Sequence, residues 1–326
     1  MDTRTIIIIC GPTGVGKSDF AELLAQQISG EIVNMDLGQF YTPLSIGTAK
    51  PDWRNARVPH HLFDILDTPQ NFTVVQYRDR LLQTCNALWE RNVTPVVVGG
   101  SMFYLKSLFF PPAVAHEGLW HGYAAEKADA SHHNVNEGGW EELNAIDPDR
   151  AAALHKNDTY RINRAMEIWR TKGIKPSLYQ PNLEMPCNVI MLYLTRNRDD
   201  LYARIDTRVI MMLQAGWLDE VRPLCDTPWE TFLHEKKLIG YNELLGYLHQ
   251  SDEGDDFDSV IRIIQQRSRH YAKRQQTFWR GLEKRLKDSY QAERTSQYTL
   301  ETDTVNLTLW DVNLYIKQLL DRLKNR

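Results

Sequence analysis

The sequence predicts an α/β fold, in which a parallel β-sheet is flanked by helices and a small, mostly helical domain is inserted. Four short apolar runs rich in β-branched residues predict buried strands, and helical apolar spacing appears between them. The predicted strands cover residues 6–9, 31–36, 94–98 and 187–194. A change of composition after residue 111 predicts the insertion, and the fourth strand predicts the return to the sheet.

Composition narrows the class of protein. The 326 residues are enough for about two domains. The apolar content of 42% and the charged content of 25% are ordinary for a soluble globular protein. No apolar run is long enough to span a membrane, and no signal peptide precedes the first strand. Four scattered cysteines without a C-x-x-C pair favour reduced thiols in a cytoplasmic protein, and a net charge of −4 does not by itself favour a polyanionic partner.

The first strand leads into the motif G-x-x-x-x-G-K-[S/T]. Its residues are Gly11, Pro12, Thr13, Gly14, Val15, Gly16, Lys17 and Ser18. A strand, a glycine-rich turn and a helix together let backbone N–H groups surround a phosphate at the positive end of the helix. Lys17 is expected to reach the outer phosphate oxygens, and the Ser18 hydroxyl to bind Mg²⁺. The motif predicts a P-loop NTPase-like core that binds a diphosphate or triphosphate, without specifying which one.

The second strand delivers Asp36 to its carboxyl end, where open α/β sheets bind ligands. Three roles remain open for this carboxylate: a Mg²⁺ ligand, a general base, or a turn residue. The following segments, 36–51 and 59–67, are polar and irregular, which is typical of functional loops. The adjacent His60 and His61 lack metal-ligand spacing, so no metal site is expected there.

A helix is expected from residue 72 to 92, followed by the third strand and by Gly99-Gly100-Ser101. This tripeptide before an apolar run predicts a second strand-to-helix turn that faces the same site. Ser101 is expected to serve as a helix N-cap, to contact the substrate, or to do both.

The insertion is expected to begin within residues 112–144 and to continue as a helix over 147–170. Arg161 and Arg164 fall on one face of that helix, where they could pair either with a phosphate backbone or with nearby acids. Beyond the fourth strand the chain is predicted to be mostly helical, with one helix over 204–224 and a turn-like break at 238–241.

A basic helix is predicted over residues 259–287. Nine Lys or Arg residues lie between Arg262 and Lys287, against one acid, Glu283. Arg269 and Lys273 are neighbours on one face at i,i+4 spacing. A solvated helix face normally alternates its charges, so this one-signed segment predicts contacts with phosphate groups.

These motifs together resemble the bacterial tRNA dimethylallyltransferases, also called isopentenyl-tRNA transferases. The matches follow the family's order from residue 6 to about 285, and the runs I-G-T-A-K-P and A-K-R-Q are the most specific. The matching positions are the loop 11–18, Asp36, Gln39, Tyr41, 46–51, 59–62, 64–67, 98–104, 157–158, Arg161, 164–167, 204–205, 208–209, Gly216, 220–221, 240–241, Glu243, Arg269, 272–275 and 279–280.

The resemblance implies transfer of a dimethylallyl group from dimethylallyl diphosphate to N6 of the adenine 3′ to the anticodon of tRNA. It implies Asp36 as general base, with Ser101 and Arg269 as further catalytic residues. Position 101 is usually threonine in the family, and serine keeps the hydroxyl. It also implies Mg²⁺ as cofactor, held at Ser18, and the tRNA anticodon stem-loop as partner. A monomer is expected.

The resemblance also assigns the binding residues. The diphosphate is expected to bind the loop 11–18 together with Lys273 and Arg274. The tRNA is expected to contact Asp36, Leu37, Gly38, Gln39, Ser101, Tyr160, Arg161, Ile162, Asn163, Arg164, Lys237, Leu238, Ile239, Gly240, Tyr241 and Asn242. The implied domains are a P-loop core over 1–112, an inserted tRNA-binding domain over 113–185, and completion of the core with C-terminal helices over 186–326.

Two positions depart from the family pattern. Leu37 replaces the usual serine after the catalytic aspartate, and Asn242 replaces the basic residue after Gly-Tyr. Three other functions remain open. A cytokinin-type enzyme would use the same chemistry on free AMP, a small-molecule kinase would use the loop for ATP, and a non-catalytic paralogue would only bind RNA. The Arg161/Arg164 pair favours RNA over AMP, and retention of Lys17 and Asp36 favours catalysis.

Overall fold

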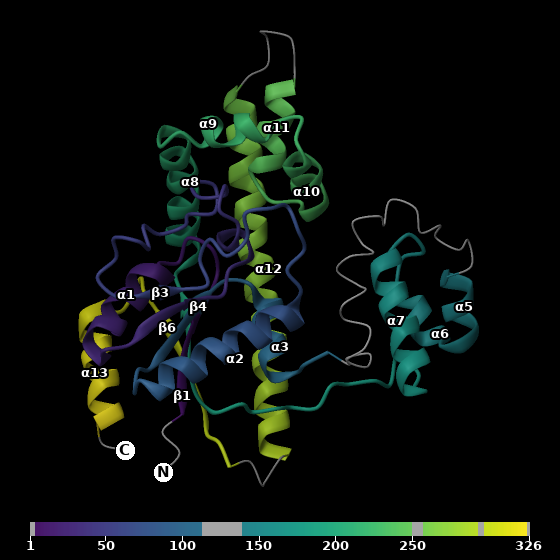
Figure 1. Ribbon diagram of the computed structural model, residues 1–326, viewed down its shortest axis with the longest axis horizontal. Helices are drawn as coiled ribbons and strands as arrows, with labels where there is room; N and C mark the ends of the chain where they lie inside the picture. Colours follow the sequence, from purple (N-terminus) through teal and green to yellow (C-terminus); the bar gives the residue numbers. More distant parts are fainter. Residues whose placement is uncertain (1–3, 113–138, 250–256, 293–296, 325–326) are drawn as a thin grey trace. The chain divides into compact units, whose positions relative to one another are not determined.

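The computed structural model describes residues 4–112, 139–249, 257–292 and 297–324 (Figure 1). The chain divides into two compact units, one made of Met1–Phe109 with Leu183–Arg326 and the other of Phe110–Asn182. Most of the predicted beginning of the insertion over 112–144, namely residues 113–138, lies outside the described residues. In the described part of the chain, no helix is both long and apolar enough to cross a membrane.

The first unit is built on a six-stranded sheet in the order β3-β2-β4-β1-β5-β6, with every neighbouring pair parallel. The strands are β1 (Thr5–Cys10), β2 (Glu31–Asn34), β3 (His60–His61), β4 (Pro95–Gly99), β5 (Asn188–Thr195) and β6 (Leu300–Asn306). β1 is central, and its Ile8 aligns with Val97 on one side and with Met191 on the other. Strands buried on both faces need no polar alternation, which explains the continuous apolar run of β1.

Helices cover both faces of this sheet. The chain moves along the sheet in opposite directions in the crossovers from β1 to β2 and from β3 to β4, so right-handed connections place α1 (Lys17–Ile28) and α2 (Val74–Glu90) on opposite faces. Ile7 and Ile9 of β1 share one core with Phe20 of α1 and Tyr315 of α13 (Val312–Lys324). The rings of Phe20 and Tyr315 lie 6.1 Å apart.

The other helices of the first unit follow the strands. They are η1 (Leu37–Phe40), α3 (Met102–Phe109), α8 (Arg198–Gln214), α9 (Trp217–Val221), η4 (Arg222–Leu224), α10 (Pro228–Lys236), α11 (Tyr241–His249) and α12 (Phe257–Ala292). The long helix α12 packs against α3, α8 and α11. Its buried residues, among them Ala272, Gln275 and Trp279, follow helical spacing along one face.

The second unit is a small helical body of its own. It contains α5 (Gly139–Ile146), α6 (Pro148–Ala152) and α7 (Thr159–Lys172). Its core includes Leu143, Leu154, Ile162 and Met166. Asp147 caps α6 by accepting from Arg150 N–H at 3.1 Å.

Three predicted elements were wrong in part. The helix over 147–170 is two helices, because the chain leaves helical geometry after α6 and Asp158 caps a new start at α7. The predicted helix over 204–224 is interrupted after α8 ends at Gln214. Gly216, with a φ of 95°, is the N-cap residue of the next helix, α9. The supposedly irregular residues His60 and His61 form β3, and His61 Nε2 lies 2.6 Å from Glu31 Oε2.

The prediction that the chain after the fourth strand is mostly helical missed β6. This strand lies at the edge of the sheet, and its sequence LETDTVN is largely polar because most of its residues are only half-buried. An apolar run is therefore not needed there, and the sequence carried no strand signal of the kind that identified the central strands.

Candidate functional site

The loop between β1 and α1 has the backbone that the motif predicts. Gly11, Gly14 and Gly16 have positive φ values of 153°, 79° and 105°, which residues other than glycine rarely adopt. A Cβ on Gly11 would lie 2.4 Å from the carbonyl oxygen of Leu194, so glycine is also required by the approach of β5. The loop therefore presents its backbone closely, at the carboxyl end of the sheet and the N-terminus of α1.

Lys17 folds back over this loop. Its Nζ donates to the carbonyl oxygens of Gly11 at 3.1 Å and Pro12 at 2.9 Å. Burial lowers the pKa of Lys17 and the Asp36 carboxylate opposes this shift; with the smaller lowering effect of Arg208, the pKa is about 8. The amine is thus a desolvated cation in a site where an arriving anion would stabilise its charge.

Three arginines surround the same loop. Arg196 Nε donates to Val15 O at 2.9 Å, and Arg204 Nε donates to Gly14 O at 3.1 Å. Arg208 donates to the Thr13 hydroxyl, and its own Nε is buried without a hydrogen-bond partner among the described residues. A buried guanidinium N–H without an acceptor is costly. An oxyanion bound in the loop is the kind of group that would satisfy it.

Gln275 of α12 connects the loop to the end of β4. Its Oε1 accepts from Thr13 N–H at 2.8 Å, and its Nε2 donates to Gly100 O at 2.9 Å. The side chain is buried, with 4% exposed. One amide therefore fixes the spacing between the phosphate loop and the strand end that carries Ser101.

Asp36 lies at the carboxyl end of β2 and caps η1. Its backbone N–H donates to Asn34 Oδ1 at 2.8 Å, and its Oδ1 accepts from Gly38 N–H at 3.2 Å. Burial raises the pKa of the carboxyl group above its ordinary value, although Lys17 and Arg208 lower it. A desolvated carboxylate with raised proton affinity, held beside two cations, has the properties of a general base.

Ser101 is at the N-cap position of α3, since its carbonyl accepts from Tyr104 N–H at 2.9 Å. Its hydroxyl bonds elsewhere: Oγ accepts from Leu37 N–H at 3.1 Å. Ser101 therefore fastens the segment that follows Asp36. Tyr271 of α12 is close enough to Asp36 to sense its charge. Burial, and then the Asp36 carboxylate, raise the pKa of the Tyr271 hydroxyl.

The residues after Asp36 anchor the loop 46–51. Gln39 Nε2 donates to the carbonyl oxygens of Thr48 at 3.1 Å and Ala49 at 3.2 Å. A Cβ on Gly38 would lie 2.6 Å from Thr48 Cγ2. In their described contacts, Gly38 and Gln39 hold this loop in place.

Arg269, Lys273 and Arg274 occupy different surroundings on α12. Arg269 forms an ion pair with Asp206 of α8. Lys273 and Arg274 are exposed, and the Arg274 guanidinium lies 5.7 Å from the centre of the Tyr271 ring. The neighbouring Gln275, rather than either cation, contacts the phosphate loop.

The segment Lys237–Asn242 joins α10 to α11. Lys237 is exposed, whereas Leu238, Ile239 and Asn242 are half-buried. Gly240 packs against Trp217, where a Cβ would meet the ring at 1.9 Å. Tyr241 is buried and donates to Glu220 Oε1 at 2.7 Å.

Glu220 also binds the loop that contains the I-G-T-A-K-P run. Its carboxylate accepts the backbone N–H groups of Ser45 at 2.9 Å, Ile46 at 2.6 Å and Gly47 at 3.1 Å. Gly47 packs directly against the Trp217 ring, because a Cβ on this residue would lie 2.0 Å from Trp217 Nε1. Glu220 and Trp217 thus join α9 to both this loop and the start of α11.

The predicted tRNA-contacting residues of the insertion lie in α7. Tyr160 contributes its backbone to this helix, Ile162 is buried in the core of the second unit, and Asn163 is exposed. Arg161 Nε lies 3.4 Å from Asp158, and Arg164 pairs with Glu167. Pairing with nearby acids, one of the two roles left open for these arginines, is therefore present, and contact with a phosphate backbone stays a prediction.

Comparison with known proteins places this site in a family. A family model described as IPP transferase matches residues 39–282. A tRNA dimethylallyltransferase of Alkaliphilus oremlandii is 34% identical over 284 residues, which cover 86% of this chain and 90% of that protein. One of Geobacter metallireducens is 37% identical over 280 residues, which cover 84% and 89%. The chain belongs to the IPP transferase family.

Solved structures agree with this IPP transferase assignment. A tRNA isopentenylpyrophosphate transferase from Bacillus halodurans superposes with a TM-score of 0.63 at 29% identity, covering 99% of this chain and 96% of that one. A eukaryotic dimethylallyltransferase described as acting on tRNA gives a TM-score of 0.76 at 26% identity, covering 99% and 80%. The predicted family and the predicted P-loop-like α/β fold are confirmed.

Sequence reasoning missed several residues of this IPP transferase site. Gln275, Arg204, Arg208 and Glu220 were part of the resemblance without a role, and Arg196 was not singled out. Their contacts with the loops at 11–16 and 45–47 join positions far apart in the chain. The only sign of these residues in the sequence was a charged or amide side chain within one of the family's motifs. Such a side chain does not by itself indicate which residue it will contact in the fold.

Proposed function

We propose that this protein transfers a dimethylallyl group from dimethylallyl diphosphate to N6 of the adenine 3′ to the anticodon in tRNA. The carrying observation is the half-buried group formed by Asp36, Lys17 and Arg208 beside the phosphate loop. It combines a proton acceptor with cations suited to a diphosphate. The names of the relatives, tRNA dimethylallyltransferase, support the same reaction.

The loop and its cations suit the leaving group. Diphosphate departs as an anion whose charge increases when its bond to carbon breaks, so donors and cations fixed in advance lower the barrier. Lys17, Arg208 and the backbone N–H groups of the loop are placed to do this. Arg269 would join them on exchanging its ion pair with Asp206, and Lys273 and Arg274 would contribute charge from the exposed side of α12.

The chain also offers a residue suited to Mg²⁺. Ser18, which carries a hydroxyl, is exposed at the second position of α1. Hydroxyl and carboxylate oxygens, completed by phosphate oxygens and water, are the ligands that Mg²⁺ prefers. When bound, the ion would neutralise charge on the diphosphate.

The transfer step assigns one role to Asp36. The N6 nitrogen forms a bond to C1 of the dimethylallyl group while the bond between C1 and the diphosphate oxygen breaks. The electron pair of that bond leaves with the diphosphate, and the N6 proton passes to the Asp36 carboxylate. Burial raises the pKa of this carboxyl group and hence its proton affinity, whereas Lys17 and Arg208 lower it.

The acceptor base lies in an RNA loop and must leave its stack to reach Asp36. Exposed residues suited to RNA contact are Lys237 between α10 and α11, and Arg161 and Asn163 on α7. Ser101, Leu37 and Gly38 lie beside Asp36, where they would border the flipped base. The monomeric state and cytoplasmic location remain predictions.

The test measures which acceptor is modified. The protein is incubated with dimethylallyl diphosphate, Mg²⁺ and an equimolar mixture of anticodon stem-loop and AMP, and the nucleosides are analysed by mass spectrometry. We expect N6-isopentenyladenosine in the stem-loop and little modified AMP. A stem-loop with guanine in place of the adenine 3′ to the anticodon is the matched control and should stay unmodified.

Other outcomes would replace this function. Preferential modification of AMP would favour the cytokinin-type enzyme. Absence of any prenylated product, with ATP consumed in the presence of a small-molecule acceptor, would favour the kinase. Stem-loop binding without either reaction would leave a non-catalytic RNA-binding protein.

A further inference from the structure

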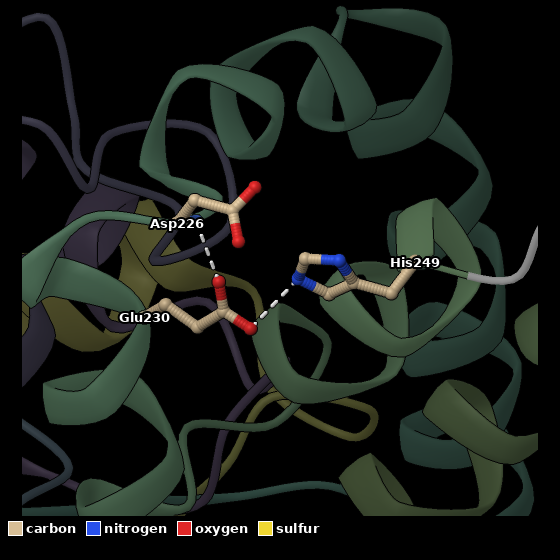
Figure 2. A group of neighbouring side chains, drawn as sticks. All are labelled: Asp226, Glu230 and His249. Carbon is tan, nitrogen blue, oxygen red and sulfur yellow. Dashed lines mark hydrogen bonds and ion pairs between the residues drawn. The ribbon is translucent and has the colours of Figure 1, made fainter.

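A second cluster of polar side chains lies where α10 begins and α11 ends. Asp226 precedes α10, Glu230 lies in its first turn, and His249 is the last residue of α11. Figure 2 shows the three side chains close to one another, with that of His249 approaching Glu230 from α11. None of them takes part in the phosphate site or in the contacts of Glu220.

The donor atoms of these side chains are close enough to share one ion. One ligand atom from each of Asp226, Glu230 and His249 lies within 4.8 Å of the other two. His249 Nε2 is 2.8 Å from Glu230 Oε1. Donors around a tetrahedral Zn²⁺ lie about 2.0–2.2 Å from the metal and hence about 3.3 Å from one another. Small side-chain movements would therefore complete the geometry.

A fourth donor points to the same carboxylate. His234 is one helical turn after Glu230, and its Nε2 lies 3.6 Å from Glu230 Oε1. Two imidazoles thus approach a single carboxylate oxygen from different elements. The neighbouring Cys225 directs its Sγ to Val221 O at 4.0 Å, so the donor set consists of nitrogen and oxygen atoms.

The Glu230 carboxylate is held ready for this role. Its Oε2 accepts from Asp226 N–H at 2.7 Å, which leaves Oε1 toward the imidazoles. An outer hydrogen bond that fixes a ligating side chain is typical of metal sites.

We infer that Asp226, Glu230 and His249, which His234 would join on moving closer, form a binding site for a divalent transition-metal cation of the Zn²⁺ type. Imidazole suits Zn²⁺ and its neighbours in the first transition series, whereas Mg²⁺ and Ca²⁺ prefer oxygen donors alone. The ion would link the start of α10 to the end of α11. These two helices carry the turn Lys237–Asn242 at their other ends, so the ion would stabilise the hairpin that presents Lys237.

The experiment is a calorimetric titration of the untagged, metal-free protein with ZnCl₂, in the absence of diphosphate, RNA and other metals. We expect one Zn²⁺ bound per chain at this site with micromolar or tighter affinity. His249→Gln and Glu230→Gln should each weaken that binding by about 100-fold or more. Loss of an outer hydrogen bond already weakens metal binding by up to about 100-fold, and these changes remove a ligand itself. His270→Gln, which changes an exposed histidine of α12, is the matched control.

A second measurement guards against misfolding of a variant. Zn²⁺ should raise the melting temperature of the wild-type protein and of His270→Gln, because a ligand that binds only the folded state stabilises it. It should not raise that of His249→Gln, whose circular dichroism should match the wild type. Wild-type binding weaker than about 100 μM, or equal binding by His249→Gln and wild type, would overturn the site.

Discussion

The phosphate end of the first unit and helix α7 of the second unit both carry positive charge, in opposite physical settings. At the phosphate end, burial shifts the pKa values of Lys17 and Asp36, and Arg208 lies beside them. On α7, the side chain of Arg161 is 63% exposed, and its acidic partner lies three residues before it. Arg164 pairs with an acid three residues after it.

The two settings differ in the energy with which charged groups interact. Two unit charges 4 Å apart interact by about 1 kcal/mol in water and by about 4 kcal/mol at an effective dielectric constant of 20. Exposed ion pairs typically contribute less than about 1 kcal/mol. Changes at the phosphate end should therefore alter catalysis strongly, whereas changes on α7 should alter a salt-dependent affinity weakly.

The largest expected effect comes from Asp36→Asn. This change keeps the shape of the side chain and removes its proton affinity, so turnover should fall by roughly 10²–10⁴-fold if Asp36 is the general base. Affinity for dimethylallyl diphosphate should change little. Single-turnover kinetics at saturating diphosphate measure the effect, with Asp79→Asn on the exposed face of α2 as control.

The same variant separates the roles left open for Asp36. Normal chemistry restored by high Mg²⁺ would make Asp36 a metal ligand. Loss of folding with no specific loss of chemistry would leave it as the residue that caps η1, a role already visible in its bond to Gly38 N–H.

The next effect is a pH dependence set by Lys17. In the free enzyme, the amine loses its charge as pH rises through its lowered pKa of about 8. The kcat/KM for dimethylallyl diphosphate should then fall above that pH, by up to about tenfold per pH unit. Bound diphosphate favours the charged amine, so kcat should show this alkaline limb at higher pH or not at all. A limb that persists unchanged in Lys17→Ala would assign it to another group.

A moderate effect is expected at Gln275, which supports the phosphate loop without carrying charge. Gln275→Ala removes the acceptor of Thr13 N–H and the donor to Gly100 O. Leaving such groups unsatisfied costs about 1–3 kcal/mol. Urea unfolding should show this loss, whereas Gln266→Ala on the exposed side of α12 should not. Equal free energies of unfolding for the two variants would show that the hydrogen bonds of Gln275 do not stabilise the protein.

The phosphate end was largely predictable because its information is local. The motif, the strand before it and the helix after it lie within residues 5–28, and the central strands carry apolar runs because both faces are buried. The supporting contacts were not predictable in this way. Gln275 is 262 residues away from Thr13, and Glu220 is 175 residues away from Ser45. Such pairs depend on the tertiary fold.

The buried positions of Ile162 and Tyr241 show a related difficulty. A sequence match does not distinguish a residue that contacts a ligand from one that packs behind it. Ile162 is in the core of the second unit, and Tyr241 is bonded to Glu220. Their predicted tRNA contacts remain untested, while their packing contacts are visible. Exposure separates them from Lys237, Arg161 and Asn163.

The smallest expected effect is that of Arg164→Ala on RNA binding. If Arg164 exchanges its pair with Glu167 for a phosphate, binding releases counterions, and affinity for an anticodon stem-loop falls with salt. The variant should make the log–log slope shallower by about 0.7–0.9, the value of one phosphate contact. Diphosphate affinity should not change, because Arg164 and Glu167 lie on α7 and are not among the residues expected to hold the diphosphate. Arg170→Ala, whose arginine pairs with Glu142 on the same body, is the control. A slope unchanged by Arg164→Ala would leave this arginine with a structural role on α7, and the contrast with the phosphate end would then be between a binding site and a structural surface.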